Sequence, residues 1–316
     1  MPKGEGSAMG NEMKTVIETL RNKSNLERFI RMGAEKVYGE EPPQIVEDRI
    51  AEELQMIRTF GYEEMLINTY LAVQVIKDAG EYHLAKGMAG ASLVNYLLDI
   101  TSVNPLPPHL RCPHCKYADF QPFAQEGEDK DGSPSGFDLV SPYQKKFSCP
   151  KCGHFMVGDG HSLPAESFFV TTGEKKPEIE LDVRPAFGEW FKKNAANILG
   201  EVVEKAPCFT VRPNQLLKDT QLLERRSGIL FRNIPIDGIQ YNEFFESEEY
   251  KDVPVLQDIP EESIKGKMFV CFSDLVNLLG EKRGENIEEA IFLFRLMWFR
   301  DHFPETYDIV KRFGPL

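Results

Sequence analysis

The chain has 316 residues, which is enough for one or two domains with a sizeable buried core. Its 50 acidic and 37 basic residues leave a net charge of −13, which argues against tight, nonspecific binding of duplex DNA over a broad basic surface. No apolar run approaches the ~18 residues of a membrane span, and six cysteines without a preceding signal peptide fit a reducing compartment, so we expect a cytoplasmic protein with no membrane contact.

The first part of the chain predicts helices. Residues 1–11 are rich in Gly, Lys and Glu and precede any periodic pattern, so we expect them to be disordered. Over residues 12–84, apolar residues recur at helical spacing, which predicts a helical lead-in. One helix should end at Gly61 and the next, over about 63–79, should stop at Gly80, because glycine adopts the left-handed conformation of a helix end without strain.

A run of small residues follows, Lys86-Gly-Met-Ala-Gly-Ala-Ser92. Ser92 can cap a helix that continues through Leu97 to Ile100. A turn that leads into a helix N-terminus offers backbone N–H groups to an anion, and Lys86 adds a positive charge, so Lys86, Gly87 and Ser92 are candidate triphosphate-binding residues. The alternative is a tight turn that lets the helix approach a strand, which requires the same small residues.

Two cysteine pairs give the most specific pattern in the sequence. Cys112 and Cys115 are separated by two residues, as are Cys149 and Cys152. This spacing lets both thiolates of a pair face one ion, and two pairs complete a tetrahedral structural zinc site. Disulfides are the alternative. His114, His154 and His161 lie near the cysteines, and we expect them on the surface because four thiolates already fill a zinc site.

Carboxylates alternate with aliphatic residues between residues 178 and 183. If this segment is a strand, Glu178, Glu180 and Asp182 lie on one face and the aliphatic residues on the other. Carboxylates arranged in this way can share the divalent metals of a phosphoryl-transfer site. The same pattern also describes a half-buried edge strand that has no catalytic role.

The remaining part, residues 204–316, predicts a mixed region followed by a C-terminal helical tail. Just before this part, the pattern predicts a helix from residue 185 to about residue 203. Strands are expected near 209–211 and 229–231, and a long helix is expected to begin at Asn286, with Glu289 in a capping position.

Several of these segments occur in an order that resembles one family. They are Gly-Met-Ala-Gly-Ala-Ser-Leu-Val at 87–94, the stretch 100–109, the two cysteine pairs, Gly-Phe-Asp-Leu at 136–139, and Gly-Glu-Lys-Lys-Pro-Glu-Ile-Glu-Leu at 173–181. This series resembles the palm of the C-family bacterial replicative polymerases, specifically the PolC type of the DNA polymerase III alpha subunit. The resemblance covers a little over half of the chain and becomes loose after about residue 200.

The resemblance implies an α+β fold with a nucleotidyltransferase-type palm, as in DNA polymerase beta, with flanking helices. The palm would occupy residues 85–203, and a zinc ribbon would be inserted at 110–155. The resemblance also implies that magnesium binds at Glu178 and Glu180 and that Lys176 belongs to the nucleotide site.

The sequence departs from the family pattern at three points. Met88 stands where the family has a serine, and it has no hydroxyl to donate to a phosphate. Glu178 and Glu180 stand where the family has aspartates, and the added methylene shifts a bound metal. The family's third catalytic aspartate has no match in context, since the surroundings of Asp237 differ from the motif.

Three functional hypotheses follow. The first is a palm remnant linked to DNA replication that is catalytically impaired and binds a replication protein, a nucleotide or DNA. The second is an active, metal-dependent DNA polymerase-like nucleotidyltransferase that uses Glu178 and Glu180. The third is a structural zinc protein whose palm residues are only ancestral. The three departures favour the first hypothesis, and the retained carboxylate charges favour the second.

Overall fold

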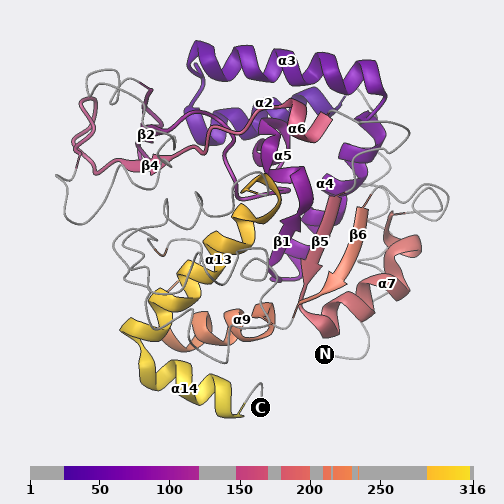
Figure 1. The fold of residues 1–316 in the computed structure, drawn as a ribbon, viewed down its shortest axis with the longest axis vertical. Helices are drawn as coiled ribbons and strands as arrows, with labels where there is room; N and C mark the ends of the chain where they lie inside the picture. The colour runs from indigo at the N-terminus through magenta and orange to yellow at the C-terminus, as the bar shows by residue number, and fades with distance from the viewer. Residues whose placement is uncertain are drawn as a thin grey trace, which may run out of the picture.

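The computed structural model describes residues 25–120, 147–169, 179–199, 209–214, 216–229, 234 and 283–313. Within these residues the chain is a mixture of helices with two small sheets, as expected for an α+β protein. One sheet lies among the helices, and the other lies at the edge of the molecule, at the upper left of Figure 1. The predicted disordered segment 1–11 lies outside the described residues.

Three N-terminal helices form the first layer: α2 (Asn25–Tyr38), α3 (Gln44–Phe60) and α4 (Glu63–Asp78). The predicted helix ends are confirmed. Gly61 has a φ of 70° and its N–H donates to the carbonyl of Ile57, and Gly80 also has a φ of 70°. Helix α2 lies unusually close to the later helix α5 (Leu93–Leu97), because a Cβ at Gly33 would lie 2.1 Å from the carbonyl oxygen of Leu97.

The central sheet contains β1 (His83–Lys86), β5 (Ile179–Val183) and β6 (Phe209–Pro213), in the order β1-β5-β6. Strand β1 runs antiparallel to β5, and β6 runs parallel to it. The register places Lys86 opposite Glu180 and Leu84 opposite Asp182. Directly paired residues share a face, so both acids and Lys86 lie on one side of the sheet.

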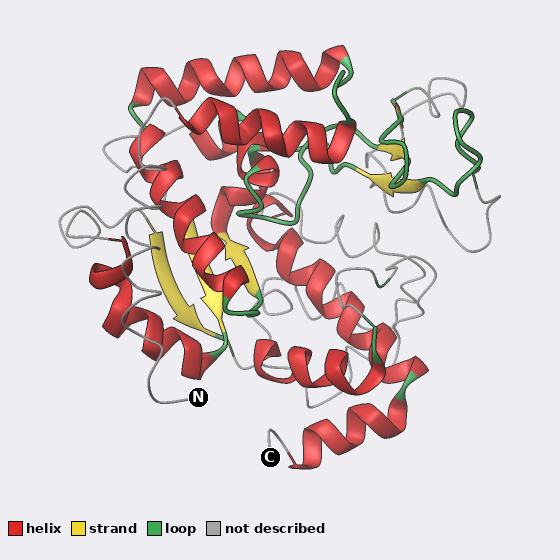
Figure 2. Ribbon diagram, turned by 180° about the vertical axis from the view of Figure 1, so that it is seen from behind, coloured by secondary structure: helices red, strands yellow, loops and turns green. Residues whose placement is uncertain are grey.

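The other face of β5 carries the aliphatic side chains Ile179, Leu181 and Val183, which are all fully buried. The predicted alternation of this strand is therefore confirmed over residues 179–183. Glu178, the first acid of the predicted set, lies outside the described residues. Figure 2, seen from behind, shows α4 crossing the sheet.

A short 3-10 helix, η1 (Gly87–Ala91), connects β1 to α5. Ser92 caps α5 as predicted, since its side chain accepts a hydrogen bond from the N–H of Asn95. The helix ends earlier than expected, at Leu97 instead of Ile100, and Asp99 then adopts a φ of 57°.

The cysteine sheet, as we call the smaller sheet, consists of β2 (His109–Arg111), β3 (Ala118–Asp119) and β4 (Val157–Asp159), in the order β3-β2-β4. Both of its pairings are antiparallel. A further bridge between Ser148 and Phe155 extends the second cysteine segment.

The remaining described elements are α6 (Glu166–Phe169), α7 (Pro185–Leu199), α9 (Leu216–Ser227), α13 (Arg283–His302) and α14 (Pro304–Phe313). Helix α7 packs on β6, and α13 packs against both η1 and β1. Figure 1 shows α13 running diagonally away from the η1 turn. Among the described helices, none has the length and apolar character needed to cross a membrane.

Two expectations about the C-terminal half are corrected. Helix α13 begins at Arg283, three residues before the predicted start at Asn286, so Glu289 lies beyond the first turn and not at a capping position. Helix α9 was not predicted as a helix, and Ile229, the first residue of a predicted strand, belongs to no strand.

Candidate functional site

The acid face of β5 brings two predicted catalytic residues, Glu180 and Asp182, together with one predicted nucleotide-binding residue, Lys86. The side chain of Asp182 is 5% exposed and that of Glu180 is 21% exposed. The ammonium Nζ of Lys86 lies 3.3 Å from Oδ2 of Asp182. The structure therefore brings three of the predicted site residues onto one face, from two strands that are far apart in the sequence.

A fourth residue completes this arrangement. Nζ of Lys86 also lies 3.3 Å from Oε1 of Glu289, whose side chain is only 4% exposed on helix α13. Lys86 is thus held between two buried carboxylates. Burial lowers the pKa of Lys86, but the charges of Glu289 and Asp182 outweigh this effect and raise it above its ordinary value. The ammonium therefore stays charged at this position.

Both acids of β5 have further partners on the neighbouring strand and its end. Asp182 accepts a hydrogen bond from Nδ2 of Asn214 at 2.9 Å. Glu180 pairs with Arg212, at 2.5 Å between Oε1 and the guanidinium nitrogen. Lys86, Arg212 and Asn214 together satisfy the two carboxylates with groups of the protein itself.

Sequence reasoning missed Glu289 as a member of this site. The residue is 203 positions from Lys86 in the chain, and only the packing of α13 against β1 brings the two together. Its one sequence signal was its spacing from Asn286, which was interpreted as helix capping.

The turn after β1 is closed by a buried carboxylate, Glu53. Its oxygens accept hydrogen bonds from the hydroxyl of Ser92 at 2.7 Å, from the N–H of Leu93 at 2.8 Å and from the N–H of Val94 at 2.9 Å. Arg49 pairs with the same carboxylate at 2.6 Å. The backbone N–H groups that were expected to cradle a triphosphate already hold an internal anion.

Glu53 also has an unusual electrostatic environment. Burial raises its pKa, and the charge of Arg49 with the hydrogen bonds from Val94 and Ser92 offsets only part of that effect. Arg49 extends the network by donating to the carbonyls of Ala91 and Leu163. Ser92 is fully buried within this network, and its hydroxyl points to Glu53.

The structure therefore places three of the predicted nucleotide-binding residues at separate positions. Lys86 lies at the acids of β5, Gly87 begins the η1 turn, and Ser92 lies in the core beside Glu53. Lys176, like Glu178, lies outside the described residues.

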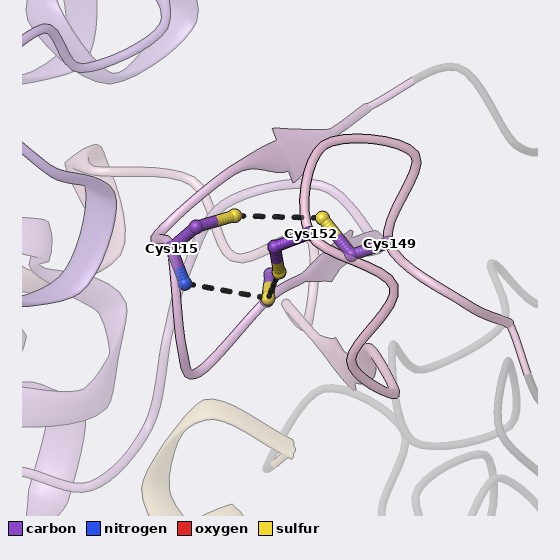
Figure 3. A group of neighbouring side chains, drawn as sticks. Cys115, Cys149 and Cys152 are labelled. Atoms are coloured by element: carbon purple, nitrogen blue, oxygen red, sulfur yellow. Dashed lines mark hydrogen bonds between the residues drawn. The ribbon is translucent and has the colours of Figure 1, made fainter.

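The four predicted zinc ligands converge at the cysteine sheet. The sulfurs of Cys112, Cys115, Cys149 and Cys152 all lie within 4.8 Å of one another, and all four are free thiols. Sγ of Cys112 is 3.5 Å from that of Cys152, and Sγ of Cys115 is 3.4 Å from that of Cys149. Figure 3 shows the side chains of Cys115, Cys149 and Cys152 gathered in one place.

Two matching turns hold the cysteines in place. The N–H of Cys112 donates to the carbonyl of Tyr117, and the N–H of Cys149 donates to that of His154, each at 2.7 Å. Each second cysteine is followed by a residue with positive φ, 65° at Lys116 and 75° at Gly153. Each half of the cluster is therefore a tight knuckle that presents its two sulfurs on one side.

The donor set and its spacing fit a tetrahedral metal ion. Four thiolates at ~2.3 Å from a zinc ion would lie about 3.8 Å from one another, close to the separations seen here. Burial raises the pKa of Cys112, but the N–H groups of Cys115 and His114 lower it to about 6. The arrangement could hold a metal ion.

The three neighbouring histidines do not behave alike. His114 and His154 are exposed, as expected, and their rings stack with centroids 3.9 Å apart. His161 is buried, contrary to the expectation, and its backbone N–H donates to the carbonyl of Leu106 where the chain leaves the cysteine sheet.

A partly buried ion pair joins two strands of the cysteine sheet, and a hydrogen bond from α5 connects this pair to the helices. Arg111 of β2 pairs with Asp159 of β4 at 2.7 Å, and the hydroxyl of Tyr96 donates to the same carboxylate at 3.1 Å. Burial raises the pKa of Asp159, but the charge of Arg111 holds it well below its ordinary value.

Comparison with known proteins places this arrangement in a family. The family model for the bacterial DNA polymerase III alpha NTPase domain matches residues 24–201. Three similar proteins carry the description DNA polymerase III PolC-type. The protein from Lactococcus lactis is 36% identical over 194 residues, that from Thermotoga maritima 34% over 208, and that from Bacillus subtilis 40% over 150.

These matches cover 57%, 65% and 47% of this chain, but only 11%, 14% and 10% of the respective relatives. The matched region thus corresponds to a small part of much longer proteins. The segment that the family model matches, residues 24–201, includes the η1 turn, the four cysteines and the acids of β5, which are segments whose order indicated the resemblance. Since the family model covers more than half of its length, the chain belongs to the family of bacterial DNA polymerase III alpha NTPase domains.

Proposed function

We propose that this chain is a PolC-like palm domain linked to DNA replication that is catalytically impaired and acts by binding a replication protein, a nucleotide or nucleic acid. In this proposal β1, η1, α5 and β5 form a reduced nucleotidyltransferase-type palm over residues 85–203. The cysteine sheet is a zinc ribbon inserted at 110–155. Membership of the family and the printed description of the relatives support the link to replication.

The observation that carries the proposal is the neutralisation of the β5 acids by cations of the protein. Lys86 lies between Asp182 and Glu289, and Arg212 pairs with Glu180. A catalytic magnesium ion requires carboxylate oxygens that are free to coordinate it. A metal at this face would first have to displace a partly buried, charged lysine and an ion-paired arginine.

The η1 turn gives independent support for impaired catalysis. Met88 supplies no hydroxyl to a phosphate, and the carboxylate of Glu53 occupies the N–H groups of Leu93 and Val94. A triphosphate at these groups would meet a buried negative charge. Loss of one preorganised donor alone can cost ~10² to 10³ in rate.

One observation favours the active alternative. Glu180 and Asp182 share a face of β5, and Glu289 adds a third carboxylate from α13 that the sequence did not reveal. If Lys86 and Arg212 moved aside, these groups could hold magnesium together with Glu178. The metal would supply the electrophilic clamp on the phosphate, and Lys86 would then be free to bind a phosphate oxygen.

The zinc proposal rests on the four converging thiols. A structural zinc ion would fix the two knuckles relative to each other, which the short strands β2, β3 and β4 do only weakly by themselves. If the chain binds neither nucleotide, nor nucleic acid, nor a replication protein, the remaining alternative is a purely structural zinc protein.

The test is incorporation of a labelled nucleotide into a primed template, with magnesium and separately with manganese. We expect no detectable turnover by the unmodified chain. Glu180→Gln serves as the control, because it removes the charge of one predicted ligand while keeping its size. Robust turnover by the unmodified chain that Glu180→Gln abolishes would overturn the proposal and establish the active alternative.

A further inference from the structure

A cavity of about 400 Å³ lies at the β1 edge of the central sheet, separate from the acids of β5. Its wall includes β1, the end of α4, the loop 99–102 and helices α9 and α13. Neither Lys86 nor Glu289 lines it, although Glu288, the residue before Glu289, does. Two successive residues of α13 therefore belong to different sites: Glu288 lines the cavity, and Glu289 pairs with Lys86.

Arg295 is the cation of this wall that forms no ion pair within the described part of the chain, whereas Lys36 and Lys77 both pair with Asp99. Within the described part of the chain, its hydrogen bond goes from Nε to the carbonyl of Ile234 at 3.3 Å, and no carboxylate lies within ion-pair distance. Burial lowers the pKa of Arg295 to about 10, and the charge of Glu288 only partly opposes this effect. A carboxylate in direct contact would have raised that pKa instead.

The carboxylates that line the cavity are engaged by other groups. Glu81 forms a bidentate pair with Arg184, and Glu224 accepts a hydrogen bond from the hydroxyl of Tyr82. Glu288 accepts from Thr101 Oγ1 at 2.6 Å and from the N–H of Ser102 at 3.0 Å. None of the three is drawn into an ion pair with Arg295.

Further positive charge lies at another part of the wall. Lys36 and Lys77 both pair with the single carboxylate of Asp99, at 3.0 Å and 2.6 Å. Two ammonium groups share one carboxylate, so the cluster of Lys36, Lys77 and Asp99 carries one net positive charge. Leu84, Ile291 and Phe292 line the rest with apolar surface.

We propose that this cavity binds a small organic phosphate, with the phosphate on the guanidinium of Arg295 and the apolar part of the molecule against Leu84, Ile291 and Phe292. An arginine presents a planar fork of donors that matches phosphate oxygens, and its charge is poorly hydrated inside the wall. The net positive charge of the cluster formed by Lys36, Lys77 and Asp99 adds to the attraction for the phosphate. The volume is in the range of small-molecule sites, which are concave, largely apolar and contain few polar groups.

This inference does not depend on the proposed function, because the cavity shares no residue with the acid face of β5. The probe is phenyl phosphate, which combines a phosphate with a compact aromatic body. Inorganic phosphate and phenol are its two halves. Calorimetric titration of the full chain should show binding of phenyl phosphate that is at least tenfold tighter than binding of either half.

Arg295→Gln should weaken binding of phenyl phosphate by about 10- to 100-fold, the loss expected for a charge-assisted contact. Arg300→Gln is the matched control, because Arg300 lies on the same helix but pairs with Asp301 on the outside, and it should leave binding unchanged. Lys77→Gln, at a partly exposed position, should weaken binding about threefold and serves if the Arg295 variant does not fold. The proposal is overturned if the unmodified chain does not bind phenyl phosphate, or if binding persists unchanged in both Arg295→Gln and Lys77→Gln.

Discussion

The hydroxyl of Ser92 donates to the carboxylate of Glu53 across 2.7 Å, and both side chains are fully buried. The sequence predicts an anion-binding role for Ser92, because a small-residue turn before a helix can bind an anion. The structure supplies that anion from α3. The unpaired N–H groups at the start of α5 thus donate to a carboxylate of the protein itself. Glu53 is therefore a stabilising residue, although nothing in the sequence distinguishes it from the other acids.

Glu53→Ala should destabilise the protein by about 3 to 5 kcal/mol, because it removes the carboxylate partner of the partly buried Arg49 and leaves three buried donors without their acceptor. The measurement is the free energy of unfolding in urea. Glu52→Ala is the matched control, since the side chain of Glu52 is 46% exposed and lies 4.0 Å from the same arginine. Its effect should stay below about 1 kcal/mol. Equal effects of the two substitutions would contradict the buried network.

The freshly purified chain should contain one zinc ion, measured by elemental analysis. Cys149→Ser should abolish stoichiometric zinc and lower the melting temperature, because three thiolates leave the ion under-coordinated. Ser148→Ala, at the neighbouring position, should retain the metal. Purified protein that holds no zinc, or a Cys149→Ser variant with full zinc content, would contradict the four-thiolate site.

Gly33→Ala should destabilise the packing of α2 on α5. A Cβ at this position would lie 2.1 Å from the carbonyl oxygen of Leu97, and neither backbone can move without shifting a helix. We expect a loss of about 1 to 3 kcal/mol in the free energy of unfolding. Glu35→Ala, at an exposed position of the same helix, controls for the change in helix propensity and should be nearly neutral. A neutral Gly33→Ala would show that the two helices are further apart.

Glu288 should make stability depend on pH. Burial raises its pKa to about 7, and the hydrogen bonds from Thr101 and Ser102 offset part of that effect. The folded state therefore binds this proton more tightly than the unfolded state, so the stabilisation is complete below the unfolded pKa near 4.5 and is lost as the pH rises through 7.

The corresponding measurement compares the unmodified chain with Glu288→Gln at pH 5 and at pH 8. The free energy of unfolding of the unmodified chain, relative to the variant, should fall by about 1 to 3 kcal/mol between the two pH values. Glu305→Gln, near the start of α14, is a control on an exposed acid and should show no such difference. A constant difference for Glu288→Gln would show that this carboxyl titrates normally.

Restoring the family residues should not restore catalysis. The triple variant Met88→Ser, Glu178→Asp and Glu180→Asp should remain inactive in nucleotide incorporation, because Lys86 and Arg212 still neutralise the acid face and Glu53 still occupies the helix end. Strong activity of the repaired chain would show that the three substitutions alone account for the impairment. Activity of the unmodified chain that the repair removes would instead indicate an enzyme adapted to glutamates.

The sequence by itself determined the features that depend on local pattern. Glycine positions predicted the ends of α3 and α4, the alternation of acids and aliphatics predicted the two faces of β5, and the spacing of the cysteine pairs predicted that four sulfurs would converge. The ordered series of motifs also identified the family. Each of these signals is contained in a short segment, where helix period, strand period or turn geometry leaves few alternatives.

Only the tertiary structure decided which groups the site residues contact. Glu289 reaches Lys86 from 203 positions away, and Glu53 reaches Ser92 from another helix. The sequence contains 50 acidic residues, and no local pattern singles out the two that are buried against these partners. Their roles follow from the packing of α13 and α3 against the η1 turn and α5, because burial makes an unpaired charge costly and so fixes which carboxylate meets which cation or helix end.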